Sequence, residues 1–188
     1  MKTKTIFILS LGIFIIILLI VFVPSLLNPS PNKPVYSPLS FDKDYSSLNK
    51  TLPGRSTIAD VEKINGKPDL TESKNGEVYL YYKTPSSALN NLVVFKNGVE
   101  IFAFENIFSN YRGAYEDLAK AYGQPDVTLY KNQSHFLWQV FLKDGVGVET
   151  DGENILAIIY FIPQDKNSFM RSVGTGMGFS EQKPEPAF

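Results

Sequence analysis

The sequence predicts an α+β protein: an N-terminal transmembrane helix, then two tandem repeats, each a helix and an antiparallel β-meander, which together form one domain with a sheet and a helix layer. Three observations predict this fold: a long apolar run near the N-terminus, a motif that recurs at a constant offset along the chain, and turn signals between short apolar runs in both repeats. The expected divisions are a transmembrane signal anchor at 1–27, a Pro-rich linker at 28–41, repeat 1 at 42–108, repeat 2 at 109–163 and an irregular C-terminal tail at 164–188.

The N-terminal apolar run is long enough to cross a membrane. Residues 6–23 are interrupted only by Ser10 and Gly12, and a helix of this length spans about 27 Å. Lys2 and Lys4 precede it, and positive charge stays on the cytoplasmic side. We therefore expect a single-pass protein of the cell membrane, held in the lipid bilayer by residues 6–27, with its C-terminal domain extracytoplasmic. A cleaved secretory signal is the alternative, although no Ala-x-Ala site follows the run.

The linker that follows is rich in proline. Proline fixes φ and lacks an amide hydrogen, so it disfavours helices and sheet interiors. The sequence therefore predicts an extended spacer between the membrane and the repeats. Its prolines are Pro29, Pro31, Pro34 and Pro38.

Each repeat begins with a predicted helix that ends in the motif G-x-P. Gly66 and Pro68 end the first helix, and Gly123 and Pro125, both at the offset of the repeat, end the second. Glycine accepts the backbone conformation that closes a helix, and proline prevents its continuation. Thr57 is the expected N-cap of the first helix, because an acidic residue follows three positions later in the manner of a capping box.

Short apolar runs after each helix predict three strands in each repeat. Asn-Gly and Asp-Gly pairs between the runs are signals for hairpin turns. In the first repeat the expected strands are 78–83, 92–95 and 99–104, and in the second they are 136–142, 146–150 and 155–162.

These helix motifs carry a family resemblance. A helix preceded by Pro53-Gly54-Arg55-Ser56-Thr57, ending in G-x-P and leading into a meander, resembles the SmpA/OmlA outer-membrane-assembly lipoprotein superfamily. Two copies in tandem resemble the β-lactamase inhibitory protein, which has the same unit. The resemblance implies an envelope scaffold or inhibitor that binds proteins through an exposed sheet face. The chain has no cysteine, so the lipid anchor and the disulfides of those relatives are absent.

Composition excludes several kinds of chemistry. Without cysteine there is no thiolate zinc site or cysteine nucleophile, and with one histidine there is no multi-histidine metal site. A net charge of −1 provides no broad basic field for nucleic acid. The remaining candidates favour a structural interpretation: His135 has no nucleophile motif beside it, residues 149–153 form an acidic hairpin turn, and residues 174–178 lack phosphate-loop spacing. We expect no metal, no cofactor and no catalysis.

Aromatic residues on the strands are the predicted partner-binding site. Strand alternation places Tyr79 and Tyr81 on one face, and the repeat offset adds Phe136 and Trp138 to it. The opposite, more aliphatic face suits packing against the helices. Tyrosine and tryptophan dominate protein interfaces, although aromatic residues also fill cores.

The function expected from these features is a membrane-anchored extracytoplasmic protein-binding module, or an envelope scaffold or inhibitor-like domain, with a protein partner in the cell envelope. Three alternatives stay open, and one of them is a purely structural stalk domain. A cell-envelope hydrolase needs two carboxylates about 5–10 Å apart in a cleft. A small-ligand sensor domain needs a deep apolar pocket between the sheet and the helices.

Overall fold

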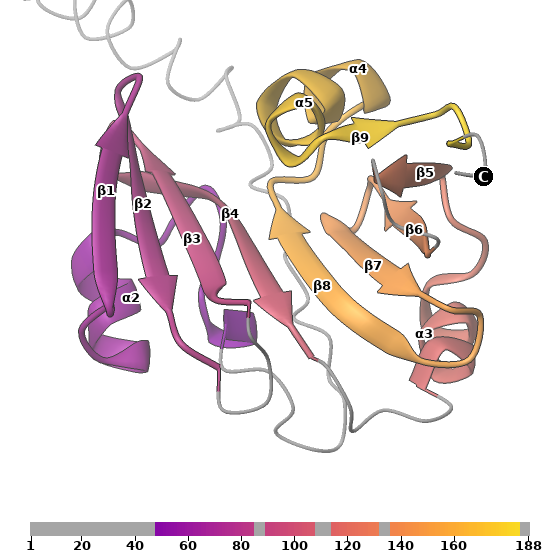
Figure 1. Cartoon of the computed structure of the whole chain (residues 1–188), viewed down its shortest axis with the longest axis horizontal. Coiled ribbons are helices and arrows are strands. Elements are labelled where there is room, and N and C mark those ends of the chain that lie inside the picture. Colours follow the sequence, from indigo (N-terminus) through magenta and orange to yellow (C-terminus); the bar gives the residue numbers. More distant parts are fainter. Residues whose placement is uncertain (1–47, 85–88, 108–113, 132–135, 185–188) are drawn as a thin grey trace, which may run out of the picture. The chain divides into compact units, whose positions relative to one another are not determined.

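The computed structural model describes residues 48–84, 89–107, 114–131 and 136–184. All of these described residues belong to one compact unit. Nine strands in this part of the chain form a single antiparallel sheet (Figure 1), in the order β1-β2-β3-β4-β8-β7-β6-β5-β9.

The two repeats lie side by side in the sheet, which continues from the last strand of the first repeat to the last strand of the second. The first repeat comprises η1 (Leu48–Lys50), α2 (Ile58–Asn65), β1 (Leu70–Lys74), β2 (Glu77–Tyr82), β3 (Asn91–Lys96) and β4 (Val99–Asn106). The second comprises α3 (Ala114–Tyr122), β5 (Val127–Lys131), β6 (Leu137–Phe141), β7 (Val146–Thr150) and β8 (Ile155–Phe161). After them come α4 (Lys166–Phe169), η2 (Met170–Gly174), α5 (Thr175–Met177) and β9 (Phe179–Ser180).

The fold class predicted from the sequence is wrong. The described chain is mostly β, with one nine-stranded sheet and short helices, instead of an α+β protein built from two three-stranded meanders. Each repeat has a fourth strand, β1 or β5, directly after its helix. The sequence of β1, LTESK, has no apolar alternation because all five residues are exposed. The segment after Pro163 also differs from the expected irregular tail, because it forms helices and a ninth strand.

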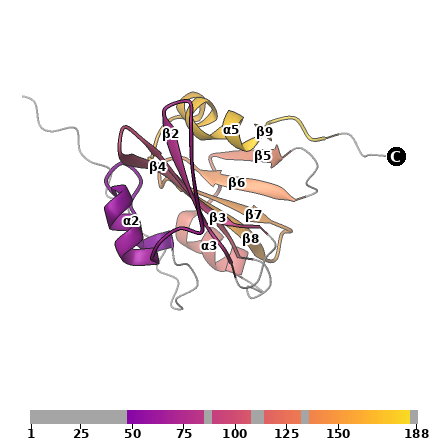
Figure 2. The same ribbon diagram turned by 60° about the vertical axis from the view of Figure 1, so that its left-hand side comes forward.

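The sheet buries a hydrophobic cluster on each face. On one face, Val61 of α2 and Leu118 of α3 pack with Leu80, Phe95 and Phe141. Here the prediction that the aliphatic face of β2 packs against the helices is confirmed. On the other face, strand residues pack against the C-terminal helical segment. Figure 2 shows α2 and α3 on one side of the strands and α5 on the other.

The predicted start and end of the first helix are confirmed. The Thr57 hydroxyl accepts a hydrogen bond from the Asp60 amide, and the Asp60 carboxylate accepts one from the Thr57 amide, which completes a capping box. Gly66 and Gly123 both have a φ of 80°, and Pro68 and Pro125 follow them. This conformation is open to glycine and rare for other residues.

Among the described residues, no helix combines the length with the apolar character that a transmembrane span requires. The predicted membrane segment at 6–27 and the predicted linker at 28–41 lie outside the described ranges, and both stay predictions.

Candidate functional site

Tyr79 and Tyr81 lie on the sheet face opposite α2, within three cross-strand rows. Facing residues of β1, β2 and β3 form an apolar row, Leu70–Tyr81–Leu92, a mixed row, Glu72–Tyr79–Val94, and a charged row, Lys74–Glu77–Lys96. Directly opposed side chains are the contacts that stabilise a sheet surface. We call the half-buried residues Tyr79, Tyr81 and Leu92 with the exposed Leu70 the tyrosine face.

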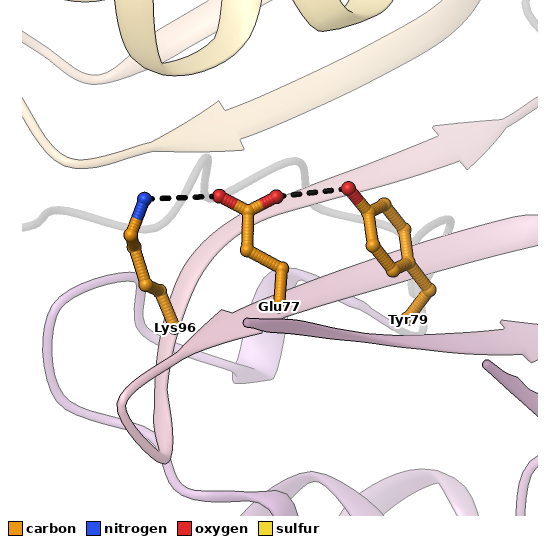
Figure 3. Close-up of polar contacts among 3 residues, drawn as sticks. All are labelled: Glu77, Tyr79 and Lys96. Atoms are coloured by element: carbon orange, nitrogen blue, oxygen red, sulfur yellow. Dashed lines mark hydrogen bonds and ion pairs between the residues drawn. The ribbon is translucent and has the colours of Figure 1, made fainter. Parts of the chain in front are cut away.

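The charged row holds Tyr79 in place. The Tyr79 hydroxyl donates a 2.8 Å hydrogen bond to one oxygen of Glu77, and the Lys96 ammonium donates a 3.2 Å bond to the other. Figure 3 shows the Glu77 carboxylate between the two side chains. The hydrogen bond to Glu77 raises the pKa of Tyr79 to about 12, so this hydroxyl stays protonated near neutral pH. These two bonds hold the hydroxyl of the half-buried Tyr79 at the Glu77 carboxylate.

The apolar row is more open to solvent. Leu70 is 49% exposed, whereas Tyr81 and Leu92 in the same row are half-buried. Beside it the Tyr81 hydroxyl donates a 3.2 Å hydrogen bond to Glu72, and partial burial raises the pKa of Tyr81. The tyrosine face therefore combines accessible apolar area with fixed hydroxyl and carboxylate groups.

The structure does not bring all four predicted aromatic residues to one surface. Trp138 shares the face of Tyr79 and Tyr81, but its side chain is 0% exposed and packs on Phe104 and Phe179, with ring centroids 5.9 and 4.9 Å away. As placed, Trp138 is buried in a core and has no surface to offer a partner.

The strand register explains part of this difference. Glu72 faces Tyr79 in the first repeat, and the equivalent Leu129 faces Trp138 in the second. Tyr79 and Trp138 are therefore structural equivalents, although the constant offset of the helix motifs pairs Trp138 with Tyr81. The reason is that the connection between β5 and β6 is longer than the β1–β2 turn. The equivalence therefore differs from the constant offset by two positions. A shift by an even number of positions leaves a strand residue on the same face, so Trp138 is on the predicted face although its equivalent is Tyr79 and not Tyr81.

Phe136 lies at a separate pocket of about 410 Å³, at the end of β5, β6 and β7. This side chain is 38% exposed. The pocket is lined by Tyr130, Phe136, Leu137, Thr150, Asp151, Gly152, Lys183 and Pro184. It does not lie between the sheet and α2 or α3, where the small-ligand alternative requires a pocket.

The other sequence candidates have structural explanations. The Asp151 carboxylate accepts hydrogen bonds from the amides of Glu153 and Asn154, and the bonds from Asn154 lower the pKa of Asp151. Gly174 lies in a helical turn, where an added Cβ would meet Met170. His135 lies outside the described residues. In the described part of the chain, His, Asp and Glu side chains form no group that could hold a metal ion.

Sequence reasoning missed two buried acidic residues on β4, Glu100 and Glu105, of which Glu100 is the more completely buried. Glu100 is 0% exposed, and the Thr51 hydroxyl donates a 3.0 Å hydrogen bond to its Oε1, while Oε2 has no hydrogen-bond partner among the described residues. Burial raises the pKa of Glu100 to about 7. The charged residue follows the Asn97-Gly98 turn in the sequence, and nothing local marks it as buried.

No known family matches the chain, and no curated protein matches it. Among solved structures it is similar to the crystal structure of an extracellular protein containing a SCP domain from Bacillus anthracis str. Ames, with 12% identity and a TM-score of 0.43. The match covers 69% of this chain and 49% of that one, so the chain spans about half the length of that protein. The predicted resemblance to outer-membrane-assembly lipoproteins is not addressed by this likeness and stays a prediction.

Proposed function

We propose that the chain is a membrane-anchored, extracytoplasmic module that binds a protein partner through the tyrosine face and performs no catalysis. The observation that carries this proposal is the apolar row Leu70–Tyr81–Leu92, which leaves Leu70 49% exposed beside a half-buried tyrosine. Aromatic and apolar groups that become fully desolvated on binding are the usual centres of protein interfaces.

The polar surroundings suit recognition of a protein surface. Glu72 is exposed next to Tyr81, and Glu77 and Lys96 form an ion pair at the other end of the face. Apolar residues bordered by charged residues of both signs match the pattern of a hydrophobic interface core with a polar rim. The fitting partner presents apolar side chains to Leu70 and Tyr81 and a hydrogen-bond donor to Glu72.

The experiment that tests this proposal is site-specific photocrosslinking in intact membranes. A photoreactive amino acid at Tyr81 should form a defined crosslink to one protein, and Leu70→Ser should reduce that crosslink at least about tenfold. The matched control places the same amino acid at Ile64 on α2, which is 43% exposed and lies away from the tyrosine face.

Two outcomes would contradict the proposal. Equal crosslinking from positions 81 and 64 would mean that the face has no specific partner. A crosslink that Leu70→Ser leaves unchanged would mean that the apolar row does not bind. Circular dichroism of the Leu70→Ser variant separates loss of binding from loss of folding, because Leu70 is exposed and its replacement should leave the fold intact.

A further inference from the structure

Strand β1 forms one end of the sheet, and no other strand in the described ranges pairs with its outer edge. All five of its residues are exposed. An unpaired edge is a template on which another strand can form hydrogen bonds. We propose that two copies of this chain associate by antiparallel pairing of their β1 strands, with Ser73 of one copy opposite Ser73 of the other.

The turn after β1 determines which backbone groups point outward. Asn75 and Gly76 have φ values of 55° and 78°, as in a two-residue type I′ turn. In such a hairpin the closing pair, Lys74 and Glu77, exchanges both of its backbone hydrogen bonds, and pairs then alternate along the ladder. Thr71 and Ser73 therefore direct their backbone N–H and C=O groups away from β2.

Within β1, three symmetric pairings bring outward-directed residues opposite each other, centred on Thr71, Glu72 or Ser73. The pairing centred on Glu72 places the Glu72 side chains of the two copies opposite each other, and like charges that face each other destabilise a strand pair. The pairing centred on Ser73 places Glu72 opposite Lys74 of the second copy, and symmetry repeats this contact. The pairing centred on Thr71 places Leu70 opposite Glu72 and forms no ion pair. Opposite charges facing each other stabilise a strand pair, so the charge pattern selects Ser73 as the centre.

The same pairing brings the tyrosine faces of the two copies to the same side of one continuous sheet. Glu72 and Lys74 belong to the rows that contain Tyr79 and Glu77, so they lie on the side of the tyrosine face. The two-fold axis of an antiparallel pair runs perpendicular to the sheet, which leaves both tyrosine faces on the same side. The dimer therefore doubles this surface, although the pairing does not depend on what the face binds.

A disulfide crosslink tests the register. The full-length chain in lipid nanodiscs carries Ser73→Cys, and because the natural sequence has no cysteine, any disulfide-linked dimer reports this position. Facing residues of a hydrogen-bonded pair have Cα atoms about 5.5 Å apart, which is within the range that a disulfide spans. We expect efficient crosslinking for Ser73→Cys and none for the control Glu116→Cys on α3.

Charge reversal tests the contact itself, by crosslinking in the Ser73→Cys background. Glu72→Lys and Lys74→Glu should each weaken dimerisation about tenfold, because each replaces two attractive pairs by two repulsive ones. An equimolar mixture of the two variants should recover dimerisation, since opposite charges then face each other at both contacts. The control Glu116→Lys changes net charge by the same amount as Glu72→Lys and should have no effect.

The results that overturn the proposal are distinct. One is the absence of a Ser73→Cys dimer. Another is a dimer that neither charge reversal weakens, which would place the association elsewhere, for example in the N-terminal apolar segment. A third is a mixture that fails to recover dimerisation. When the same variant is placed in intact membranes, a crosslink from Ser73→Cys only to a different protein would mean that a foreign strand occupies the edge.

Discussion

The two repeats are built alike in the positions that join each helix to its sheet. Asp69 and Asp126 each donate a backbone hydrogen bond to the second strand of their repeat, at 2.8 and 2.9 Å. Each carboxylate also accepts a 2.8 Å bond from a backbone amide beyond that strand, Lys83 or Leu142. In both repeats, the aspartate after G-x-P therefore joins the end of the helix to the second strand by two hydrogen bonds. We call this pair of bonds an aspartate clamp.

The repeats differ in what covers them. In the second repeat, β9 pairs with the outer edge of β5, and Phe169 and Phe179 join the cluster that buries Trp138. In the first, the equivalent strand β1 ends the sheet, and Tyr79, the equivalent of Trp138, is half-buried. The C-terminal segment thus covers the edge and one face of the sheet in the second repeat. In the first repeat, the outer edge of β1 and the tyrosine face stay accessible.

Truncation of the equivalent aromatic residues should have the largest and most unequal effect. Trp138→Ala removes a fully buried ring and should lower the free energy of unfolding by about 3–5 kcal/mol. Tyr79→Ala removes a half-buried ring and should cost about 1 kcal/mol. Denaturant unfolding followed by circular dichroism measures both, because Trp138 is the one tryptophan and its fluorescence disappears with it. Equal costs would contradict the distinction between a covered and an open repeat.

A second contrast lies at equivalent buried positions on the last strands of the repeats. The register of the β3–β4 pairing shifts just before the pair Phe95–Glu100, and the register of the β7–β8 pairing shifts just before the pair Thr150–Ile155. Glu100 in β4 and Ile155 in β8 are therefore structural equivalents. Both side chains are buried. The first repeat therefore carries an ionisable group where the second has a purely apolar one.

Glu100→Gln should flatten the pH dependence of stability. Because the folded-state pKa of Glu100 is about 7 and its ordinary pKa is 4.5, the folded protein retains a proton that the unfolded chain releases. Its contribution to stability is therefore fully present below pH 4.5 and is lost as the pH rises through 7. The shift corresponds to about 3 kcal/mol. Unfolding at a series of pH values measures how far the free energy of unfolding falls as the pH rises. In Glu100→Gln this fall should be smaller than in the unsubstituted chain by about this amount. An unchanged slope would contradict an ionisable role for Glu100.

The features that could be predicted from the sequence are those with local causes. Thr57 and Asp60 form the capping box, and Asn97-Gly98 forms the turn between β3 and β4, with φ values of 53° and 77°. The same dipeptide at 75–76 is a signal for the β1–β2 hairpin that the three-strand prediction leaves out. Recognition of that turn predicts a fourth strand, because polar residues on both faces are compatible with an exposed edge strand.

Features that depend on distant contacts could not be predicted in this way. Trp138 is buried by Phe179, which lies far along the chain beyond the second repeat, and alternation alone indicates a face without indicating what covers it. Alternation correctly places Tyr79 and Tyr81 on one face of β2, but it did not anticipate that the C-terminal segment buries Trp138. The role of this face in binding stays a prediction. Composition was misleading there, since a glycine- and serine-rich segment formed helices around Phe169 and Val173.

The smallest expected contrast concerns the aspartate clamps, which look equivalent but differ in their surroundings. Asp126→Ala leaves the amide of Leu142, a residue only 8% exposed, without its acceptor, and this should cost about 2 kcal/mol. Asp69→Ala leaves the amide of the exposed Lys83, which water can satisfy, so the cost should be about 1 kcal/mol. Because the sites have no shared partners, the double variant should show the sum of the two costs in denaturant unfolding. A larger cost at Asp69 would mean that the open repeat depends on its clamp more than the covered one does.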